Sequence, residues 1–272
     1  MDSSKFLIIG ANGQLGRALQ EKYPSAKAVD VAELDISNKS AVENFDWNNI
    51  EIILNAAAYT NVDGAETPEG REMAHKVNVD GVVNITEAVK KHDLTLVHIS
   101  TEYVFNGARN PHTENEPFSP MSVYGSTKAE GDKFAAKVSK YYLIRTSWVI
   151  GEGKNFVRIM LDIGQKGINP AVINDNSGRL TFTDELVRAI DHLLVTHTPY
   201  GTYNLSNGGE PASWAKITSE IFKDAELSNK VTGIATAEYY KDKPEAAKRP
   251  LNSVLELAKI KATGFEPHDW RQ

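Results

Sequence analysis

The 272-residue sequence contains no cysteine, and this absence excludes several chemistries at once. Disulfide bonds, cysteine-ligated zinc, iron–sulfur clusters and thiol nucleophiles all require that side chain, and no metal site is predicted. Long apolar runs are missing too, since none approaches the roughly 18 residues of a membrane helix. The first apolar run, Phe6–Ile9, is too short for a signal peptide. We therefore expect a cytoplasmic protein without a membrane partner.

Positive charge is also scarce. The chain has 30 Lys and Arg against 36 Asp and Glu, a net charge of −6. Nucleic-acid binders and surface-bound membrane proteins need a basic patch, which this balance argues against. The length suits one large α/β unit or two small domains. The composition therefore indicates a soluble globular protein that does not bind nucleic acid.

Short apolar runs alternate with amphipathic segments through the first half of the chain. The expected strands are Phe6–Ile9, Ala28–Val31, Ile52–Leu54, Leu94–Ile99 and Tyr142–Ile144, and the expected helices are Gln14–Lys22, Glu69–Lys91 and Val123–Lys140. Strands that are apolar on both faces and separated by helices are typical of a covered parallel sheet. We predict an α/β fold with a Rossmann-type doubly wound parallel sheet.

The pattern loosens beyond about residue 150, and no linker rich in Pro, Gly or Ser divides the chain. We expect one compact unit with a Rossmann lobe over residues 1–165 and a smaller C-terminal lobe over residues 166–272, parts of which can interleave. Helical patterns at Asn155–Lys166, Asp184–Val195 and Ser213–Lys223, and a strand at Gly201–Leu205, are expected there. The charged stretch Glu238–Arg249 is predicted to be an exposed loop or helix.

The segment Gly10-Ala11-Asn12-Gly13-Gln14-Leu15-Gly16 directly follows the first strand and opens the first helix. Glycines at such a turn let the backbone approach a pyrophosphate, whose charge is stabilised by the helix N-terminus. With 19 glycines in the chain, the spacing by itself is a weak signal, and an ordinary tight turn is the alternative. The position after the first strand favours dinucleotide binding.

Asp30 lies at the end of the second expected strand, 20 residues after Gly10. A carboxylate at this place accepts hydrogen bonds from the adenine ribose and repels a 2′-phosphate. No arginine lies between Arg17 and Arg71 to attract that phosphate. The cofactor is therefore NADH or NADPH, with NADH slightly favoured. A surface Asp at a strand end is the alternative reading.

Three Tyr-x-x-x-Lys pairs occur in the sequence, and only one has a suitable context. Tyr124 and Lys128 open a long helical pattern after a strand that ends at Ser100-Thr101. Residues four apart share a helix face, so the Lys128 ammonium is expected to lower the pKa of Tyr124. Tyr124 would donate a proton to an oxygen whose carbon receives hydride, with Thr101 beside the same oxygen. A Tyr packed on a Lys stem and a Thr that caps a strand are the alternatives.

At this point the sequence resembles the extended short-chain dehydrogenase/reductase superfamily and, within it, the dTDP-4-dehydrorhamnose reductases. The matching segments extend over almost the whole chain: Gly10–Gly16, Asn55–Thr60, Val62-Asp63, Ala65-Glu66, Ser100–Phe105, Glu116-Pro117, Pro120, Tyr124-Gly125, Lys128, Arg145–Val149, Asn155-Phe156, Met160, Arg249-Pro250 and Asn252-Ser253. The runs Asn-Ala-Ala-Ala-Tyr-Thr and Arg-Thr-Ser-Trp are far more selective than the glycine turn.

The resemblance implies NAD(P)H-dependent reduction of the 4-keto group of dTDP-4-dehydro-L-rhamnose to dTDP-L-rhamnose. It assigns the catalytic roles to Tyr124, Lys128 and Thr101, and the C-terminal lobe mainly to substrate binding. The cofactor-binding residues it implies, together with the glycine turn, are Gly10, Asn12, Gly13, Gln14, Leu15, Asp30, Asp35, Ile36, Ala57, Ala58, Tyr59, Ile99 and Lys128. The substrate-binding residues are Thr101, Glu102, Tyr124 and Trp148. The expected partner is a dTDP-sugar, and the sequence leaves a homodimer open.

Three positions depart from the family pattern. Glu102 stands where the family usually has Asp, so its carboxylate reaches one methylene further. In Asp175-Asn176-Ser177-Gly178-Arg179-Leu180-Thr181, Asn176 and Leu180 replace the usual Gln and Pro. These changes concern the substrate side more than the chemistry. The chain also stops at Gln272, where relatives often continue into a final helix.

Two other functions stay open. The first is a sugar-nucleotide epimerase or dehydratase on the same scaffold, but the second carboxylate of the dehydratases is replaced by Tyr103. The second is a non-catalytic, cofactor-binding regulatory subunit that resembles the β subunit of methionine adenosyltransferase. Such a subunit would not need the combination of Tyr124, Lys128 and Thr101.

Overall fold

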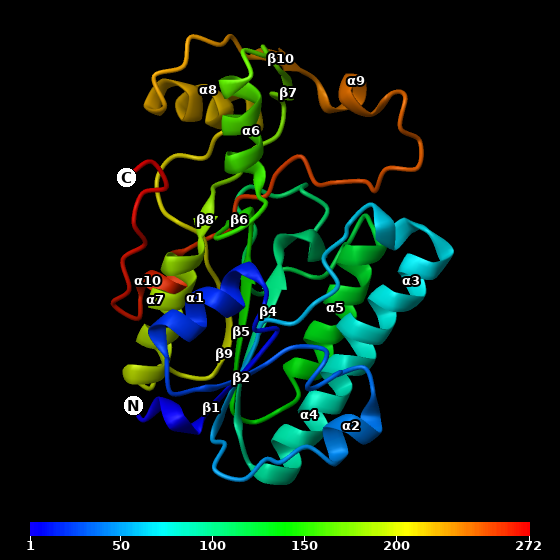
Figure 1. Cartoon of the computed structure of the whole chain (residues 1–272), viewed down its shortest axis with the longest axis vertical. Coiled ribbons are helices and arrows are strands. Elements are labelled where there is room, and N and C mark those ends of the chain that lie inside the picture. Colours follow the sequence, from blue (N-terminus) through cyan, green and yellow to red (C-terminus); the bar gives the residue numbers. More distant parts are fainter.

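Six parallel strands form the central sheet of the computed structural model, which describes residues 1–272. Their order across the sheet is β2-β1-β3-β4-β5-β9 (Figure 1). The strands are β1 (Phe6–Ile9), β2 (Lys27–Val29), β3 (Ile52–Asn55), β4 (Thr95–Thr101), β5 (Tyr141–Thr146) and β9 (Gly201–Asn204). The predicted α/β fold with a Rossmann-type doubly wound sheet is confirmed.

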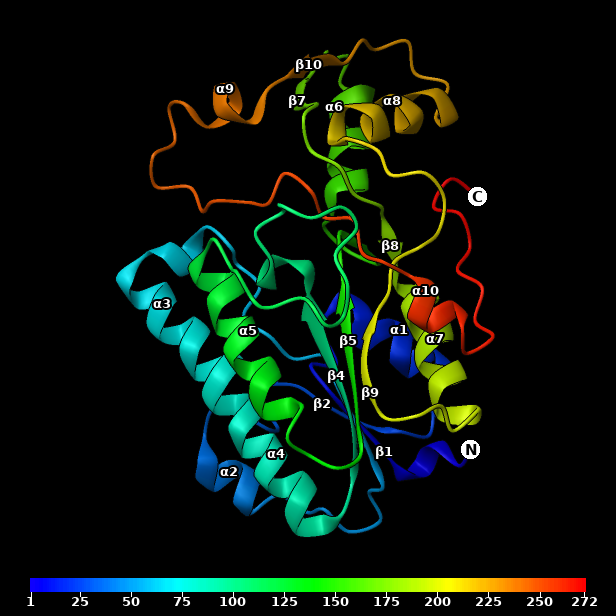
Figure 2. The ribbon, with the colours of Figure 1, turned by 180° about the vertical axis from the view of Figure 1, so that it is seen from behind.

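Helices cover both faces of this sheet, as Figures 1 and 2 show. One face carries α1 (Gln14–Lys22), α7 (Thr183–Val195) and α10 (Ala258–Lys261), and the other carries α2 (Lys39–Glu43), α3 (Pro68–His75), α4 (Gly81–His92) and α5 (Val123–Ala135). Successive residues of β1 point to opposite faces. Phe6 and Ile8 therefore pack with α1 and α7, whereas Leu7 and Ile9 pack with α4.

A smaller lobe lies beyond the carboxyl ends of the strands. It contains α6 (Phe156–Gln165), α8 (Trp214–Asp224), α9 (Thr236–Tyr240) and the short paired strands β6 (Val149–Ile150) with β8 (Thr181–Phe182) and β7 (Ala171–Ile173) with β10 (Thr232–Ile234). The chain crosses between the lobes more than once. After α6 and β7, it returns to the sheet lobe as α7 and β9 before forming α8.

The expected boundaries agree closely in the first half, with two differences. The helix expected at Glu69–Lys91 consists of α3 and α4 joined by a π-helical turn, Lys76–Asp80. The helix expected at Val123–Lys140 was predicted too long, because α5 ends at Ala135. Lys137 and Val138 make i→i−3 hydrogen bonds instead, which tighten the chain before β5 begins at Tyr141.

The strand order reverses at β1, since the chain passes from β1 to β2 on one side and to β3 on the other. Open α/β sheets bind ligands at such a point, outside the carboxyl ends of the strands. The glycine turn after β1, residues 56–60 after β3 and Thr101 at the end of β4 all lie at this edge.

Single 3-10 turns occupy Ser3–Lys5, Gly64–Glu66 and Glu102–Val104. None of the helices combines the length and apolar character needed to cross a membrane.

Candidate active site

The glycine turn forms a cradle that has no room for side chains. Gly10 has a φ of +83°, and a Cβ on it would lie 2.7 Å from the backbone nitrogen of Ala57. A Cβ on Gly16 would collide with the Gly10 carbonyl. Gly13 is the N-cap of α1 and provides no side-chain cap, and the N–H groups of Gln14 and Leu15 find no acceptor within the chain. These free donors at a helix N-terminus fit the pyrophosphate of a dinucleotide.

A cavity of about 420 Å³ opens beside this cradle, and we call it the glycine-loop cavity. Among the residues that line it are nine of the predicted cofactor-binding residues: Gly10, Asn12, Gly13, Asp30, Asp35, Ile36, Ala57, Ala58 and Tyr59. Asp30 accepts hydrogen bonds from the N–H groups of Asn12 and Val31, both at 2.8 Å. The carboxylate thus holds the glycine turn in place, and its remaining lone pairs face the cavity that a ribose would enter.

The second cavity, of about 480 Å³, contains the predicted catalytic residues, and we call it the tyrosine–lysine cavity. The predicted residues that line it are Gly13, Gln14, Leu15, Ala58, Ile99, Thr101, Glu102, Tyr124, Lys128 and Trp148. Gly13 and Ala58 line both cavities, so the two are adjacent. All predicted site residues therefore line one or other of two adjacent cavities above the switch point of the sheet.

Lys128 is almost fully buried, and its ammonium donates a 2.7 Å hydrogen bond to the carbonyl of Ile99. Burial lowers the pKa of Lys128 to about 8, and the negative charge of Asp132 opposes that shift. Asp132, one helical turn further along α5, pairs with the buried Arg145 across an Nε–Oδ2 distance of 3.4 Å. A buried row of charges therefore extends from the cavity into the core, and Asp132, its carboxylate, favours the charged form of Lys128.

The pKa of Tyr124 is shifted in the direction opposite to the one expected. Burial raises the pKa of Tyr124, and the charge of Glu102 raises it further. The expected lowering of the Tyr124 pKa by Lys128 is therefore wrong for the polypeptide by itself, because desolvation of the buried phenol dominates the shift. The phenol stays protonated across the physiological range, which a proton donor requires before it reacts.

Thr101 and Glu102 act as one hydrogen-bonded unit. The Thr101 hydroxyl donates to Glu102 Oε2 at 2.9 Å and accepts from the N–H of Tyr103 at 3.2 Å. Burial raises the pKa of Glu102 to about 7, although the hydrogen bond from Thr101 lowers it. The carboxyl at the departing position is therefore close to half ionised near neutral pH.

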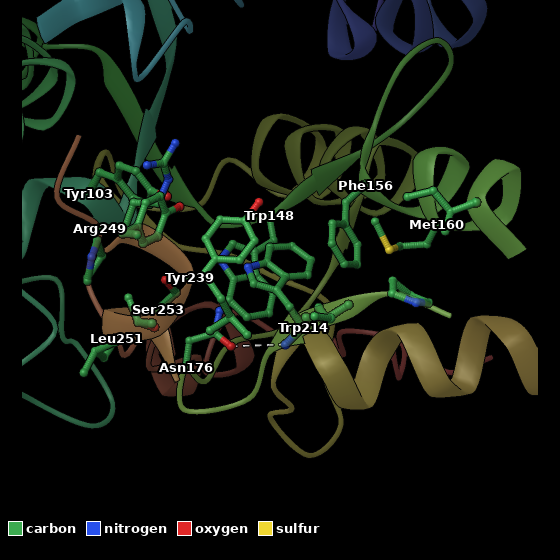
Figure 3. A pocket seen from close by; sticks show the side chains of 18 residues that line it. Tyr103, Trp148, Phe156, Met160, Asn176, Trp214, Tyr239, Arg249, Leu251 and Ser253 are labelled. Atoms are coloured by element: carbon green, nitrogen blue, oxygen red, sulfur yellow. Dashed lines mark hydrogen bonds between the residues drawn. The ribbon is translucent and has the colours of Figure 1, made fainter. Parts of the chain in front are cut away.

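A third cavity, of about 400 Å³, adjoins the second and is mostly aromatic and apolar; we call it the aromatic cavity (Figure 3). Trp148 and Trp214 line both, and their rings stack with centroids 3.7 Å apart. Trp148 has a φ of +45°, and a Cβ on Gly178 would collide with its ring. The backbone thus holds Trp148 at the junction of the two cavities, where it can contact a substrate that extends through both.

Arg249 is the one charged side chain that lines the aromatic cavity. It faces the cavity beside Tyr103, across from the tryptophan pair (Figure 3). The sequence prediction assigned no role to Arg249 or Trp214. Arg249 lies in the matched Arg249-Pro250 motif, which was a usable signal, whereas Trp214 lies in no motif. An arginine at the edge of an apolar pocket is suited to an anionic group attached to a flat ring.

Asn78 is a third residue that the sequence prediction missed. Its side chain accepts from the Tyr59 N–H at 2.9 Å and donates to the Tyr59 carbonyl at 3.1 Å and to Thr127 Oγ1 at 3.1 Å. Asn78 lies in the π-helical turn and is buried. It thereby fixes the backbone of Tyr59, which lines the glycine-loop cavity, against the helix that carries Lys128.

Asn176 and Leu180, the two residues after β7 that differ from the family pattern, lie in different surroundings. Asn176 lines the aromatic cavity, and its side-chain oxygen accepts from the N–H of Trp214 at 3.1 Å (Figure 3). Leu180 instead packs into a small core with Ile150, Ile217 and Trp270. Asn176 therefore positions the first turn of α8, and Leu180 contributes to packing.

Comparisons with known proteins agree with one another. Residues 4–272 match the family model described as RmlD substrate binding domain. The dTDP-4-dehydrorhamnose reductase of Aggregatibacter actinomycetemcomitans is 38% identical, over 99% of this chain and 96% of that protein. The protein of the same name from Escherichia coli K12 is 33% identical, over 93% of this chain and 90% of that protein.

The fold comparison identifies similar solved structures. The crystal structure of dTDP-4-dehydrorhamnose reductase from Bacillus anthracis in complex with NADP superimposes with a TM-score of 0.90. The two sequences are 34% identical, and the match covers 98% of this chain and 95% of that chain.

Proposed function

This chain belongs to the RmlD substrate binding domain family, and from that premise we propose that it reduces the 4-keto group of dTDP-4-dehydro-L-rhamnose to give dTDP-L-rhamnose. The observation that carries the proposal is the order of the three cavities. Tyr124 and Lys128 line the cavity that adjoins the glycine-loop cavity on one side and, on the other, the aromatic cavity with its single cation. A cofactor and an anionic substrate bound at the two ends would meet at Tyr124.

The free N–H groups of Gln14 and Leu15 would hold the pyrophosphate of NADH or NADPH, and the bound cofactor would supply a hydride for the C4 carbon while the keto oxygen takes up a proton. Tyr124 is the donor of that proton, because its phenol is protonated at neutral pH and lines the cavity. Lys128 stands one helical turn away and stabilises the phenolate that the transfer leaves. Thr101 lies at the same wall, and its hydroxyl would hold the keto oxygen by turning its proton from Glu102 toward that oxygen.

The aromatic cavity would receive the nucleotide part of the substrate. Its aromatic walls, Trp148, Trp214 and Tyr239 among them, offer faces for a pyrimidine ring. Arg249 retains free N–H groups for a diphosphate. The anionic substrate is thus held by local charge in a chain whose net charge is −6.

Glu102 gives the reaction a pH dependence that can be measured. Its pKa is about 7, so the carboxyl is protonated below that pH and ionised above it. Ionised Glu102 raises the pKa of Tyr124 and makes the phenol a weaker acid. We expect kcat to fall as the pH rises through about 7. In Glu102→Gln, kcat should stay constant with pH until Lys128 loses its proton near pH 8.

Steady-state kinetics between pH 5.5 and 9 measure this profile. An unchanged break near pH 7 in Glu102→Gln would assign the titration to another group. The effect belongs in kcat, so the profile is taken at saturating substrate, which separates it from any loss of sugar binding.

The overall activity is tested by following the oxidation of NADH and NADPH with the 4-keto sugar nucleotide as substrate. Turnover that requires the keto sugar supports the proposal. Tight cofactor binding without turnover on any keto sugar would instead support the regulatory alternative. Parallel titrations with the two cofactors decide whether Asp30 favours NADH.

A further inference from the structure

The residues Val62-Asp63 and Ala65-Glu66 belong to the matched motifs, yet the proposed chemistry gives them no role. They form a short stretch between β3 and α3, residues 62–66, which we call the bridge segment. Its two carboxylates point to different parts of the active site. Asp63 contacts the C-terminal lobe, and Glu66 contacts the helix that carries Tyr124.

Asp63 holds the C-terminal lobe through two hydrogen bonds. Its Oδ2 accepts from Arg249 Nη2 at 2.7 Å, and its Oδ1 accepts from the N–H of Ala247 at 3.0 Å. The hydrogen bond from Arg249 holds the pKa of Asp63 below its usual range. Arg249 also donates from Nη1 to the Ala247 carbonyl, so its guanidinium is fixed by two partners at the wall of the aromatic cavity.

The part of the chain that Asp63 holds is otherwise weakly attached. Residues 235–250, which we call the arm, form the loop that carries α9 (Figure 1). The arm is hydrogen-bonded to the rest of the molecule at two places, Thr236 to Asp175 and the pair Ala247 and Arg249 to Asp63. Most arm residues before Ala247 are exposed. Segments with few buried contacts open easily, so the Asp63 contact governs whether the arm stays closed.

The arm supplies one side of the aromatic cavity. Thr236, Tyr239, Tyr240, Arg249 and Pro250 all line that cavity. Opening the arm would therefore remove both the tyrosines and the cation that face the nucleotide. Asp63 itself does not line the cavity, so it acts on a bound nucleotide through Arg249.

Glu66 makes the second contact. Its Oε1 accepts a 2.9 Å hydrogen bond from the N–H of Val123, the first residue of α5. The Ser122 hydroxyl accepts from the N–H of Gly125, so two caps fix the first turn that carries Tyr124. A carboxylate at this end of α5 also interacts favourably with the helix dipole.

We propose that the bridge segment positions both halves of the active site, with Asp63 holding the arm closed over the nucleotide and Glu66 fixing the helix start that carries Tyr124. The inference rests on the proposed function, because it concerns the same substrate. Both carboxylates are positioning residues. Asp63 and Glu66 lie three positions apart in the sequence and have different partners, so each contact can be altered without the other.

The experiment compares four variants: Asp63→Asn, Glu66→Ala, the conservative Glu66→Gln and the control Glu238→Gln. Glu238 pairs with Lys241 on the surface of the same arm and contacts no cavity. For Asp63→Asn we expect the affinity for dTDP, measured by calorimetry, to fall about three- to five-fold, as for a partly exposed ion pair. Its KM for the keto sugar nucleotide rises by the same factor, and kcat is unchanged. The backbone amides of residues 237–247 exchange faster with solvent.

Glu66→Ala has the opposite pattern. We expect kcat to fall roughly tenfold through misplacement of Tyr124, with the affinity for dTDP unchanged; Glu66→Gln, which keeps an acceptor oxygen, restores most of kcat. Glu238→Gln matches the wild type in every measurement. An unchanged affinity for dTDP and unchanged arm exchange in Asp63→Asn would overturn the role of Asp63, and an unchanged kcat in Glu66→Ala would overturn that of Glu66. If the proposed function is wrong, the wild type itself will not turn over the keto sugar nucleotide. The exchange of the arm amides with solvent needs no turnover, so it tests the role of Asp63 even in that case.

Discussion

Replacing Tyr124 with Phe is expected to lower kcat by at least about 10²-fold, the smaller end of the range for general acid catalysis. The substitution removes only the hydroxyl, and the ring keeps its packing against Tyr103, whose centroid lies 5.8 Å away. Lys128 does not take its place, because its ammonium is turned toward the Ile99 carbonyl, and the Glu102 carboxyl is hydrogen-bonded with Thr101. Single-turnover kinetics with the keto sugar nucleotide measure the loss directly.

The matched control is Tyr23→Phe, because Tyr23 and Lys27 form another Tyr-x-x-x-Lys pair. Tyr23 caps the C-terminal end of α1, donates to Asp191 at 2.9 Å and lines none of the three cavities. We expect kcat of this variant to be unchanged, with a small loss of stability. The affinity of Tyr124→Phe for NADH and NADPH should equal that of the wild type. Full activity in Tyr124→Phe would contradict the assigned mechanism.

Replacing Asp132 with Ala is expected to have the largest effect on stability. Asp132 and Arg145 are both almost fully buried, with side-chain exposures of 1% and 6%. Removing one partner of such a pair costs about 3–5 kcal/mol, because the other charge is left in a low-dielectric interior. For a chain of this size we expect the melting temperature to fall by about 10 °C. Thermal unfolding monitored by circular dichroism measures it.

The same variant has a second consequence at the active site. The charge of Asp132 supports the ammonium of Lys128, so its loss should lower the pKa of Lys128 further below about 8. The surface variant Glu51→Gln, which breaks the exposed pair with Lys5, is the control and should change stability by less than about 0.5 kcal/mol. Equal melting temperatures for the two variants would show that the buried pair contributes no more than a surface one.

The sheet and the cleft could be predicted because their signals are local. Buried parallel strands are apolar on both faces, and Gly10, Gly13 and Gly16 mark a turn whose geometry excludes side chains. Tyr124 and Lys128 were selected among three similar pairs by their position at a helix start after a strand. Each of these inferences needed only neighbouring residues and a general rule for parallel sheets.

The substrate side was predicted less completely because it is assembled from distant segments. Trp148, Trp214 and Arg249 come from three parts of the chain and meet only after the small lobe folds. The direction of the pKa shift of Tyr124 was also missed, since helical spacing reports the neighbouring Lys128 but not the burial of the phenol. The role of the bridge segment could not be predicted either, because it depends on the contact between Asp63 and Arg249, which lies 186 residues further along the chain.

The most direct test of the central claim follows the hydrogen atom itself. The protein is incubated with the 4-keto sugar nucleotide and a cofactor deuterated at the transferred position of the nicotinamide, and the product is examined by NMR. We expect one deuterium at C4 of the sugar, one equivalent of oxidised cofactor, and the configuration of dTDP-L-rhamnose. A product without deuterium at C4, or a substrate recovered unchanged while the cofactor stays bound, would contradict the assignment of this chain as a 4-keto sugar nucleotide reductase.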